Sequence, residues 1–217
     1  MEGINLIHGD SLQALKGYSD NHFDWAIVDP PYGISLTKSP RLNKDKGWSD
    51  GGWDDSIPTA KYFNEIIRVS KNQIIWGWNY FTDYLPPCRG VICWDKMNHT
   101  ENFSDVEIAY CSIDSVAKKF TYMWDGNRYG FPSKIQGVGK KSIRIHPAQK
   151  PIDLYRWILK NYTSEGDLIL DTHLGSGSIA LACHYMKRNL IGYEIDKEYY
   201  DAACKRFKEQ TMQQALW

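Results

Sequence analysis

The stretch that decides the fold is Asp167-Leu-Ile-Leu-Asp171-Thr-His-Leu-Gly175-Ser-Gly177-Ser178. It begins with an apolar run that ends in an aspartate, which is typical of a strand buried in a parallel sheet. Two glycines follow, and glycine lets a backbone turn sharply and pass close to a ligand. A helical pattern starts at Ser178, and the first turn of a helix presents unpaired amide groups. The stretch therefore predicts a strand, a glycine-rich turn and a helix in that order.

The same alternation of strand and helix extends over the whole chain. A second apolar run, at residues 23–29, also ends in an aspartate. Further strands are expected at residues 5–8, 73–76, 90–94, 106–110 and 189–193, and helices at 11–16, 59–70, 152–162, 178–186 and 197–210. This pattern predicts an α/β fold with a Rossmann-like sheet and helices on both faces. A chain of 217 residues fits a single domain spanning residues 1–217.

Residues 33–58 interrupt that rhythm. They are rich in Gly, Asp, Lys and Ser and are too long for an ordinary connection. Because they directly follow Asp29-Pro30-Pro31-Tyr32, we expect them to form a lid loop over a site at that point.

Residues 116–150 also break the pattern, and they are basic. They contain eight Lys or Arg residues against one acidic residue, Asp125. Such a patch can neutralise phosphates, although a solvated surface would have the same composition. We expect a small recognition insertion here, with the phosphate contacts made by Lys134, Lys140, Lys141 and Arg144.

Overall composition limits the class of protein. Lys plus Arg and Asp plus Glu are both 26, so the net charge is zero. There is no apolar run of about 18 residues and no signal-peptide pattern at the start, so no membrane span is expected. The five cysteines form no CxxC pair and the histidines show no ligand spacing, which predicts reduced thiols, a cytoplasmic protein and no metal.

The glycine-rich turn is typical of a nucleoside site. The next expected strand ends at Glu194, whose carboxylate can accept both hydrogen bonds of a ribose diol. Gly175-Ser-Gly177-Ser-Ile-Ala180 also satisfies the dinucleotide pattern, so an NAD enzyme is an alternative. Asp171, just before the turn, suits a cationic cofactor that carries an amino acid better than a pyrophosphate.

Asp29-Pro30-Pro31-Tyr32 indicates a second site. The two prolines stiffen the backbone and remove two amide donors. The Asp29 carboxylate and the Pro30 carbonyl are then available as acceptors, matching the two hydrogens of a primary aromatic amine. Tyr32 can stack on the ring that carries the amine. Hydride transfer does not need such a site.

Together these two motifs resemble the S-adenosylmethionine-dependent amino-methyltransferases of DNA. The tetrapeptide precedes the cofactor turn, which is the permuted, β-class order of bacterial and phage enzymes. The other family-like segments are Gly9-Asp10-Ser-Leu, Trp94-Asp-Lys96-Met-Asn98 followed by Phe103-Ser-Asp-Val-Glu107, His146-Pro-Ala-Gln-Lys150-Pro151 and Gly192-Tyr-Glu194-Ile-Asp196. One departure is Thr172-His173, where the family usually has Pro-Phe.

The resemblance implies a function and a set of site residues. Asp29, Pro30 and Tyr32 are expected to be catalytic, and S-adenosylmethionine is the expected cofactor. The residues expected to bind it are Asp10, Ser11, Asp29, Lys150, Asp171, His173, Gly175, Ser176, Gly177, Ser178, Glu194 and Ile195. Asp at position 29 favours adenine N6 over cytosine N4, because cytosine-specific members more often have Ser there.

The expected substrate is an adenine flipped out of double-stranded DNA. An N4-cytosine enzyme, an RNA adenine enzyme and a non-catalytic DNA-binding relative are alternatives. Because family members often dimerise, a homodimer is an alternative to the monomer.

Overall fold

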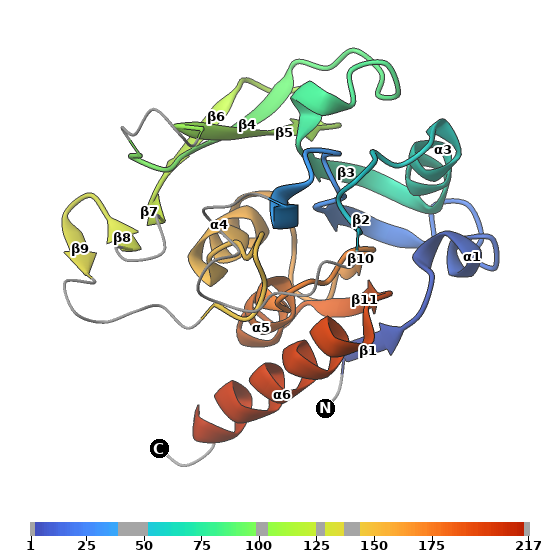
Figure 1. Cartoon of the computed structure of the whole chain (residues 1–217). Coiled ribbons are helices and arrows are strands. Elements are labelled where there is room, and N and C mark those ends of the chain that lie inside the picture. Colours follow the sequence, from blue (N-terminus) through green and yellow to red (C-terminus); the bar gives the residue numbers. More distant parts are fainter. Residues whose placement is uncertain (1–2, 39–51, 99–103, 125–128, 137–143, 215–217) are drawn as a thin grey trace.

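A twisted sheet of eight strands crosses the molecule in the order β1-β11-β10-β2-β3-β5-β4-β6 (Figure 1). The computed structural model describes residues 3–38, 52–98, 104–124, 129–136 and 144–214. The strands are β1 (Ile4–His8), β2 (Phe23–Val28), β3 (Ser70–Trp76), β4 (Gly90–Asp95), β5 (Val106–Cys111), β6 (Lys118–Thr121), β10 (Leu168–Asp171) and β11 (Asn189–Glu194). Neighbouring strands from β1 to β3 are parallel, whereas β5 runs antiparallel to both β3 and β4. The sheet is therefore mostly parallel.

Helices cover both faces of this sheet, as the sequence predicts. They are α1 (Ser11–Leu15), α3 (Ala60–Val69), α4 (Ile152–Tyr162), α5 (Ser178–Tyr185) and α6 (Lys197–Gln214), with short 3-10 turns η1 (Leu36–Lys38) and η2 (Trp78–Tyr80). Within the described ranges, no helix combines the length and the apolar character that a membrane crossing requires.

The alternation of side chains along β2 explains the two-sided packing. Trp25 and Ile27 belong to a core cluster with residues of α4 and α5, whereas Ala26 and Val28 belong to a second cluster with residues of α3. Successive side chains of a strand point to opposite faces, so a strand buried on both faces is apolar throughout. This is why residues 23–28 form a continuous apolar run.

The order of the strands determines where a ligand can bind. After β2 the chain continues to β3 on one side, and after β10 it continues to β11 on the other side. In such sheets the crevice lies at the carboxyl ends of the strands where the direction of winding changes. β2 and β10 are neighbours at that point, so the residues after Val28 and Asp171 meet there.

Residues 118–136 form strands that the sequence pattern does not predict. β6 extends the main sheet, and β7 (Met123–Trp124), β8 (Tyr129–Phe131) and β9 (Lys134–Gln136) form a separate antiparallel sheet beyond its edge (Figure 1). Each of these strands has between two and four residues, too few to show a periodicity.

Candidate active site

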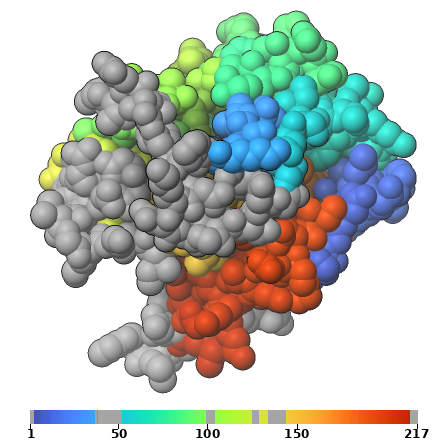
Figure 2. Space-filling model, viewed as in Figure 1, coloured from blue at the N-terminus to red at the C-terminus, as the bar shows by residue number. Residues whose placement is uncertain are grey.

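A cavity of about 730 Å³ lies at the carboxyl edge of the sheet. Its volume is in the range of small-molecule sites, about 300–1,000 Å³. The tetrapeptide after β2 and the glycine-rich turn after β10 both line it, together with residues from β4, β5 and the segment before α4. In Figure 2 the light-blue residues that follow β2 are at the surface on this side of the molecule. The two motifs that the sequence singled out therefore share one cavity.

Asp29 follows the last residue of β2, and two donors hold its carboxylate. The Tyr32 hydroxyl donates to Oδ1 at 2.7 Å, and the Lys150 ammonium donates to Oδ2 at 2.5 Å. Among the described residues, no hydrogen-bond donor reaches the Pro30 carbonyl. The geometry thus leaves Pro30 as an open acceptor and fixes the orientation of Asp29.

The Tyr32 ring does not stand free in the cavity. It stacks on Tyr80 of η2, with 5.0 Å between ring centroids and an angle of 14° between planes. Gly77 touches the same ring, because a side-chain Cβ at this position would be 2.3 Å from Tyr32 Cε1. Gly77 also has a φ of +78°, which side chains other than hydrogen rarely allow. Both the contact with the Tyr32 ring and the backbone conformation therefore require glycine here. A base that stacks on the Tyr32 face now held by Tyr80 must displace Tyr80.

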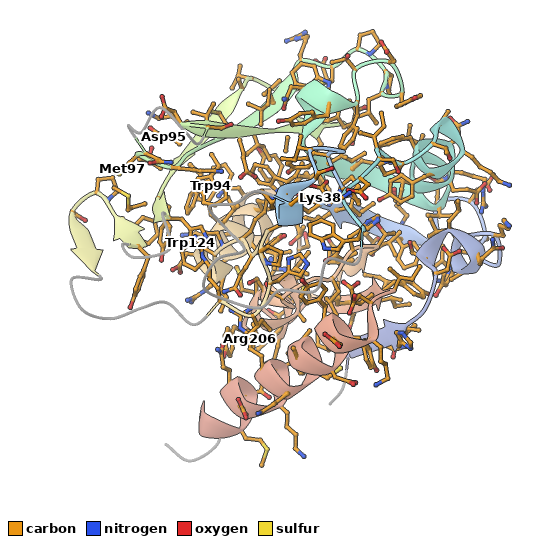
Figure 3. All side chains as sticks on the ribbon, in the orientation of Figure 1. Lys38, Trp94, Asp95, Met97, Trp124 and Arg206 are labelled. Carbon is orange, nitrogen blue, oxygen red and sulfur yellow. The ribbon has the colours of Figure 1, made fainter. Side chains whose placement is uncertain are left out.

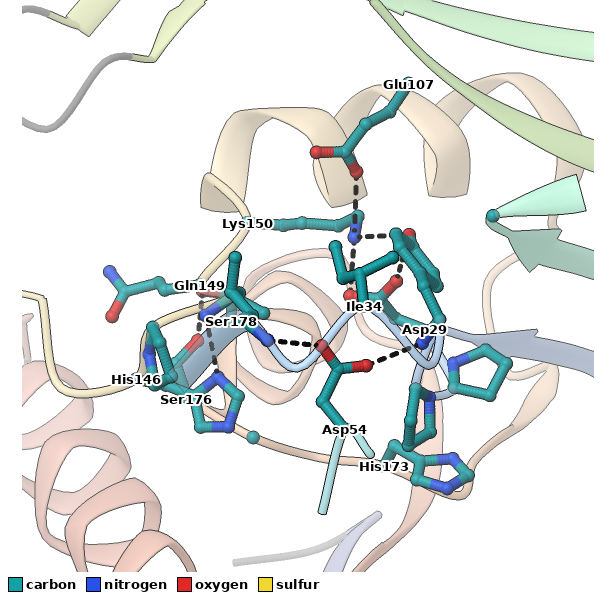
Figure 4. A pocket seen from close by; sticks show the side chains of 18 of the residues that line it. Asp29, Ile34, Asp54, Glu107, His146, Gln149, Lys150, His173, Ser176 and Ser178 are labelled. Atoms are coloured by element: carbon teal, nitrogen blue, oxygen red, sulfur yellow. Dashed lines mark hydrogen bonds and ion pairs between the residues drawn. The ribbon is translucent and has the colours of Figure 1, made fainter. Parts of the chain in front are cut away.

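Asp54 fixes the backbone of the tetrapeptide from the segment expected to be a lid. Its buried carboxylate accepts hydrogen bonds from the backbone amides of Tyr32, Gly33 and Leu36 at 2.8, 3.0 and 3.0 Å (Figure 4). The described parts of that segment therefore pack on the tetrapeptide. Sequence reasoning missed Asp54, because the segment contains several acidic residues and no pattern distinguishes this one.

Lys150 joins Asp29 to a second buried acid, Glu107 of β5. Its Nζ lies 3.1 Å from Glu107 Oε2 (Figure 4). Glu107 also pairs with Lys96. The side chain of Lys150 is only 5% exposed and that of Asp29 is 14% exposed. Ammonium and carboxylate groups therefore alternate in the order Lys96, Glu107, Lys150, Asp29. Sequence reasoning noted the segments with Lys96 and Glu107 but gave these two residues no role.

Burial and pairing shift the pKa values in this chain of ions. Burial raises the pKa of Asp29, and the Lys150 ammonium offsets only part of that rise. Burial would also raise the pKa of Glu107, but Lys150 and Lys96 outweigh it and lower that pKa to about 2. Burial would lower the pKa of Lys150, but the two carboxylates raise it. Lys150 is accordingly a permanent cation that supports the anionic form of Asp29.

The opposite wall of the cavity is built by the glycine-rich turn. Glu194 ends β11, and its two carboxylate oxygens accept hydrogen bonds from the amides of Gly175 and Asp196 at 2.8 and 3.0 Å. Burial raises the pKa of Glu194, although these amides partly oppose the rise. Each carboxylate oxygen has two lone pairs, so Glu194 keeps acceptor capacity towards the cavity.

A smaller cavity of about 310 Å³ continues the site on the side of β1. Asp10, Ser11, Ile57 and Pro58 line it, and Asp10 caps α1 by accepting the Leu12 amide at 2.8 Å. His173 and Ile195 line both cavities. Ile195 is 62% exposed and lines both cavities, so its side chain offers an apolar surface there.

The two cavities bring together most of the residues expected to hold a cofactor. The larger cavity is lined by Asp29, Lys150, His173, Gly175, Ser176, Ser178, Glu194 and Ile195, and the smaller one by Asp10, Ser11, His173 and Ile195. Asp171 and Gly177 line neither. Asp171 is buried beneath the turn, where it accepts the His173 amide at 3.1 Å. Burial raises the pKa of Asp171 to about 8.

The residues expected to contact DNA are only partly described. Arg144 lines the larger cavity, and its guanidinium carbon lies 5.3 Å from the ring centroid of Trp124. Figure 3 shows Trp94 and Trp124 on the side of the molecule towards β7. Lys134 belongs to β9, and Lys140 and Lys141 lie outside the described residues. No group of three or more His, Cys, Asp or Glu side chains that could hold a metal occurs in the described part of the chain.

Comparison with known proteins identifies the family. A family model described as DNA methylase matches residues 72–205. M.HpaI of Haemophilus parainfluenzae, a type II methyltransferase, is 27% identical over 94% of this chain and 74% of its own length. The chain therefore belongs to the DNA methylase family.

Solved structures show the same fold. The M1.HpyAVI–SAM complex matches with a TM-score of 0.56 and 22% identity, over 94% of this chain and 99% of that chain. The PvuII DNA methyltransferase, described as cytosine-N4-specific, matches with a TM-score of 0.64 and 14% identity, over 95% of this chain and 87% of that chain.

Proposed function

We propose that this chain transfers the methyl group of S-adenosylmethionine to the N6 amine of an adenine in double-stranded DNA. Family membership makes the chain a DNA methyltransferase. The observation that carries the proposal is the shared cavity, in which the oriented Asp29 carboxylate faces the same space as the glycine-rich turn and Glu194. An amine acceptor and a nucleoside site are thus next to each other.

The described residues fit S-adenosylmethionine. Glu194 retains acceptor capacity for a ribose diol, Ile195 offers an apolar wall for the adenine ring, and Asp10 lies at the polar end of the smaller cavity. When bound, the cofactor supplies a methyl group on a sulfonium, which is a good leaving group. Positioning is therefore the main task of the protein.

The residues of the tetrapeptide position the substrate amine. The Asp29 carboxylate and the Pro30 carbonyl accept its two hydrogens, which draws the nitrogen lone pair out of conjugation with the ring. The target base must leave the duplex to reach this buried position. Tyr32 donates to Asp29 and so holds the carboxylate in one orientation.

We assign Lys150 a second role besides the cofactor contact expected from the sequence. It lies between Asp29 and Glu107, so it favours the ionised form of the largely buried Asp29. An ionised carboxylate only accepts hydrogen bonds, as the amine requires, whereas a protonated one also donates.

The test is a methylation assay with labelled S-adenosylmethionine on unmethylated genomic DNA, followed by digestion to nucleosides. We expect label in N6-methyladenine. Label in N4-methylcytosine would overturn the choice of base, label only with an RNA substrate would overturn the choice of DNA, and no incorporation would indicate a non-catalytic relative.

A variant pair tests the role of Asp29. Asp29→Ala should lose most of its turnover while cofactor affinity changes little, because a contact made in the transition state is lost. Asp201→Ala, at an exposed position on α6, is the matched control and should keep full activity. Near-normal turnover of Asp29→Ala would refute the assignment.

The proposal also covers where the enzyme acts and how many copies of the chain assemble. We expect the enzyme to act in the cytoplasm, where bacterial DNA lies. We also expect a homodimer, and light scattering on the purified protein would distinguish it from a monomer.

A further inference from the structure

Two buried hydroxyl groups and a half-buried imidazole form a hydrogen-bonded series that ends at the site. The Tyr62 hydroxyl of α3 lies 2.6 Å from Thr172 Oγ1, and Thr172 Oγ1 lies 3.0 Å from His173 Nδ1. Tyr62 and Thr172 are each 3% exposed. Thr172-His173 is also the place where the sequence departs from the Pro-Phe usual in the family it resembles. The departure therefore introduces a polar series where Pro-Phe offers no side-chain hydrogen bond.

The direction of the hydrogen bonds in this series can be derived. The Tyr62 hydroxyl is buried and keeps its proton, since burial raises its pKa far above the usual value. Among the described residues its partners are Thr172 Oγ1 and, at 3.5 Å, His173 Nδ1. A buried donor without an acceptor is costly, so the Tyr62 proton goes to Thr172. The Thr172 hydroxyl then donates its own proton to His173 Nδ1.

This order determines which nitrogen of His173 carries the proton. Nδ1 accepts from Thr172, so in the neutral ring the proton is on Nε2. Burial lowers the pKa of His173 to about 4, although Asp10 opposes this, so the ring is neutral near pH 7. No described residue hydrogen-bonds to Nε2. Because His173 lines both cavities, its Nε2–H group is available to donate to a ligand where the two cavities meet.

We propose that Tyr62 and Thr172 hold His173 as a neutral ring whose Nε2–H donates a hydrogen bond to a ring nitrogen of the cofactor's adenine. This inference rests on the proposed use of S-adenosylmethionine. Adenine ring nitrogens other than the glycosidic one only accept, so they match a side chain that offers only a donor. The ribose hydroxyls both donate and accept, and the acceptor Glu194 already suits them. His173 is then a specificity residue for the cofactor, and Tyr62 and Thr172 are positioning residues.

The test uses S-adenosylhomocysteine and its 1-deaza, 3-deaza and 7-deaza adenine analogues, each of which lacks one of the three ring nitrogens that can accept. Calorimetry on the wild-type protein should show one analogue binding about 3- to 10-fold more weakly than the parent, the size of one neutral hydrogen bond. His173→Phe keeps an aromatic ring and should bind the parent and that analogue equally. If the wild type discriminates against none of the three analogues, the inference is overturned.

Variants of the positioning residues separate this role from a structural one. Tyr62→Phe and Thr172→Val should reduce the discrimination between parent and analogue, whereas a merely structural defect would weaken both ligands alike and leave their ratio unchanged. Tyr18→Phe is the matched control, because it removes another Tyr hydroxyl with a hydrogen bond of 2.7 Å, to Tyr193, away from the two cavities.

The tautomer has its own readout, which does not require a ligand. Long-range ¹H–¹⁵N correlation spectra of the free protein should show His173 protonated on Nε2, and a proton on Nδ1 would overturn the inference. The proposed function and the proposed role of His173 are refuted by different results. No binding of S-adenosylhomocysteine would refute the proposed function, whereas tight binding without analogue discrimination would refute only the role of His173.

Discussion

Replacing Lys150 with Met tests how the site keeps Asp29 ionised. The variant removes the ammonium and keeps an unbranched side chain of similar reach. In the wild type, Nζ lies 2.5 Å from Asp29 Oδ2 and 3.1 Å from Glu107 Oε2. Without it, Glu107 keeps Lys96, but among the described residues Asp29 has no other ion-pair partner.

Two magnitudes follow from this geometry. Removing one partner of a buried ion pair costs about 3–5 kcal/mol, because the other charge is left without compensation. In a chain of this size each kcal/mol lowers Tm by about 2–4 °C, so Tm should fall by roughly 6–20 °C. Burial already raises the pKa of Asp29 against the opposing effect of Lys150, so losing Lys150 raises it further. A larger fraction of Asp29 is then protonated at a given pH than in the wild type, and turnover falls.

The assay is kcat as a function of pH, from mildly acidic to mildly alkaline, together with thermal melts. Activity needs the deprotonated carboxylate, so the turnover of the variant should recover as pH rises through the raised pKa, whereas the wild type reaches its plateau at lower pH. Lys71→Met is the matched control. Lys71 pairs with Asp24 at 2.7 Å but is 54% exposed, so solvent screens the pair and its loss should change Tm little and leave the pH profile unchanged. An unchanged acid limb in Lys150→Met, or an equal loss of turnover at every pH, would refute the electrostatic role.

Four further changes test other parts of the site. Glu194→Ala should weaken S-adenosylmethionine binding by about 1–3 kcal/mol in calorimetry, because a ribose diol would lose its acceptor; unchanged affinity would remove Glu194 from the site. Asp171→Asn should gain stability relative to the wild type by about 1.4 kcal/mol for each pH unit between about 4 and about 8. In that range the folded wild type keeps a proton on Asp171 that the unfolded chain has lost, so the wild type loses stability as the pH rises and the variant does not. Urea melts at several pH values measure this difference, and a difference that does not change with pH would contradict the idea. Asp54→Ala removes the acceptor of three backbone amides and should lower kcat by about 100-fold through misplacement of the tetrapeptide, and kinetics within a few-fold of wild type would contradict this. Lys140→Ala with Lys141→Ala should weaken binding to all DNA sequences alike and flatten the salt dependence by about one unit per lost contact, and identical anisotropy titrations would show that the DNA path runs elsewhere.

The sequence predicts most of the fold because buried strands and helices require apolar residues at characteristic spacings. The strand expected at residues 23–29 is β2, and the helix expected at 152–162 is α4. The spacing of apolar residues contains no information on strand direction, so the sequence did not predict that β5 runs antiparallel to its neighbours. The strands of the 116–150 segment were missed because they are too short to have a period.

The sequence identified residues that the structure brings together where the order of the strands alone decides their position. Asp29 and Glu194 follow or end apolar strands, and parallel strands bring such ends to one edge. Glu107, Asp54 and Tyr80 were missed because their roles depend on partners brought near by folding. Lys150 and Asp29, for example, are 121 positions apart in the chain. The sequence resemblance suggested a cofactor contact for Lys150, but only the fold shows its two carboxylate partners.

The hydrogen bonds that Asp29 already accepts from Tyr32 and Lys150 are compatible with its proposed role as an acceptor for the substrate amine. Each carboxylate oxygen has two lone pairs, and Tyr32 uses one on Oδ1 while Lys150 uses one on Oδ2. One lone pair therefore remains on each oxygen for a substrate hydrogen. The two resident donors fix the carboxylate, which otherwise would have to be ordered when the substrate binds. They also favour its charged form despite burial. A buried residue that must accept a hydrogen bond from a weakly acidic amine needs both effects, and here Tyr32 and Lys150 provide them from positions 118 residues apart in the chain.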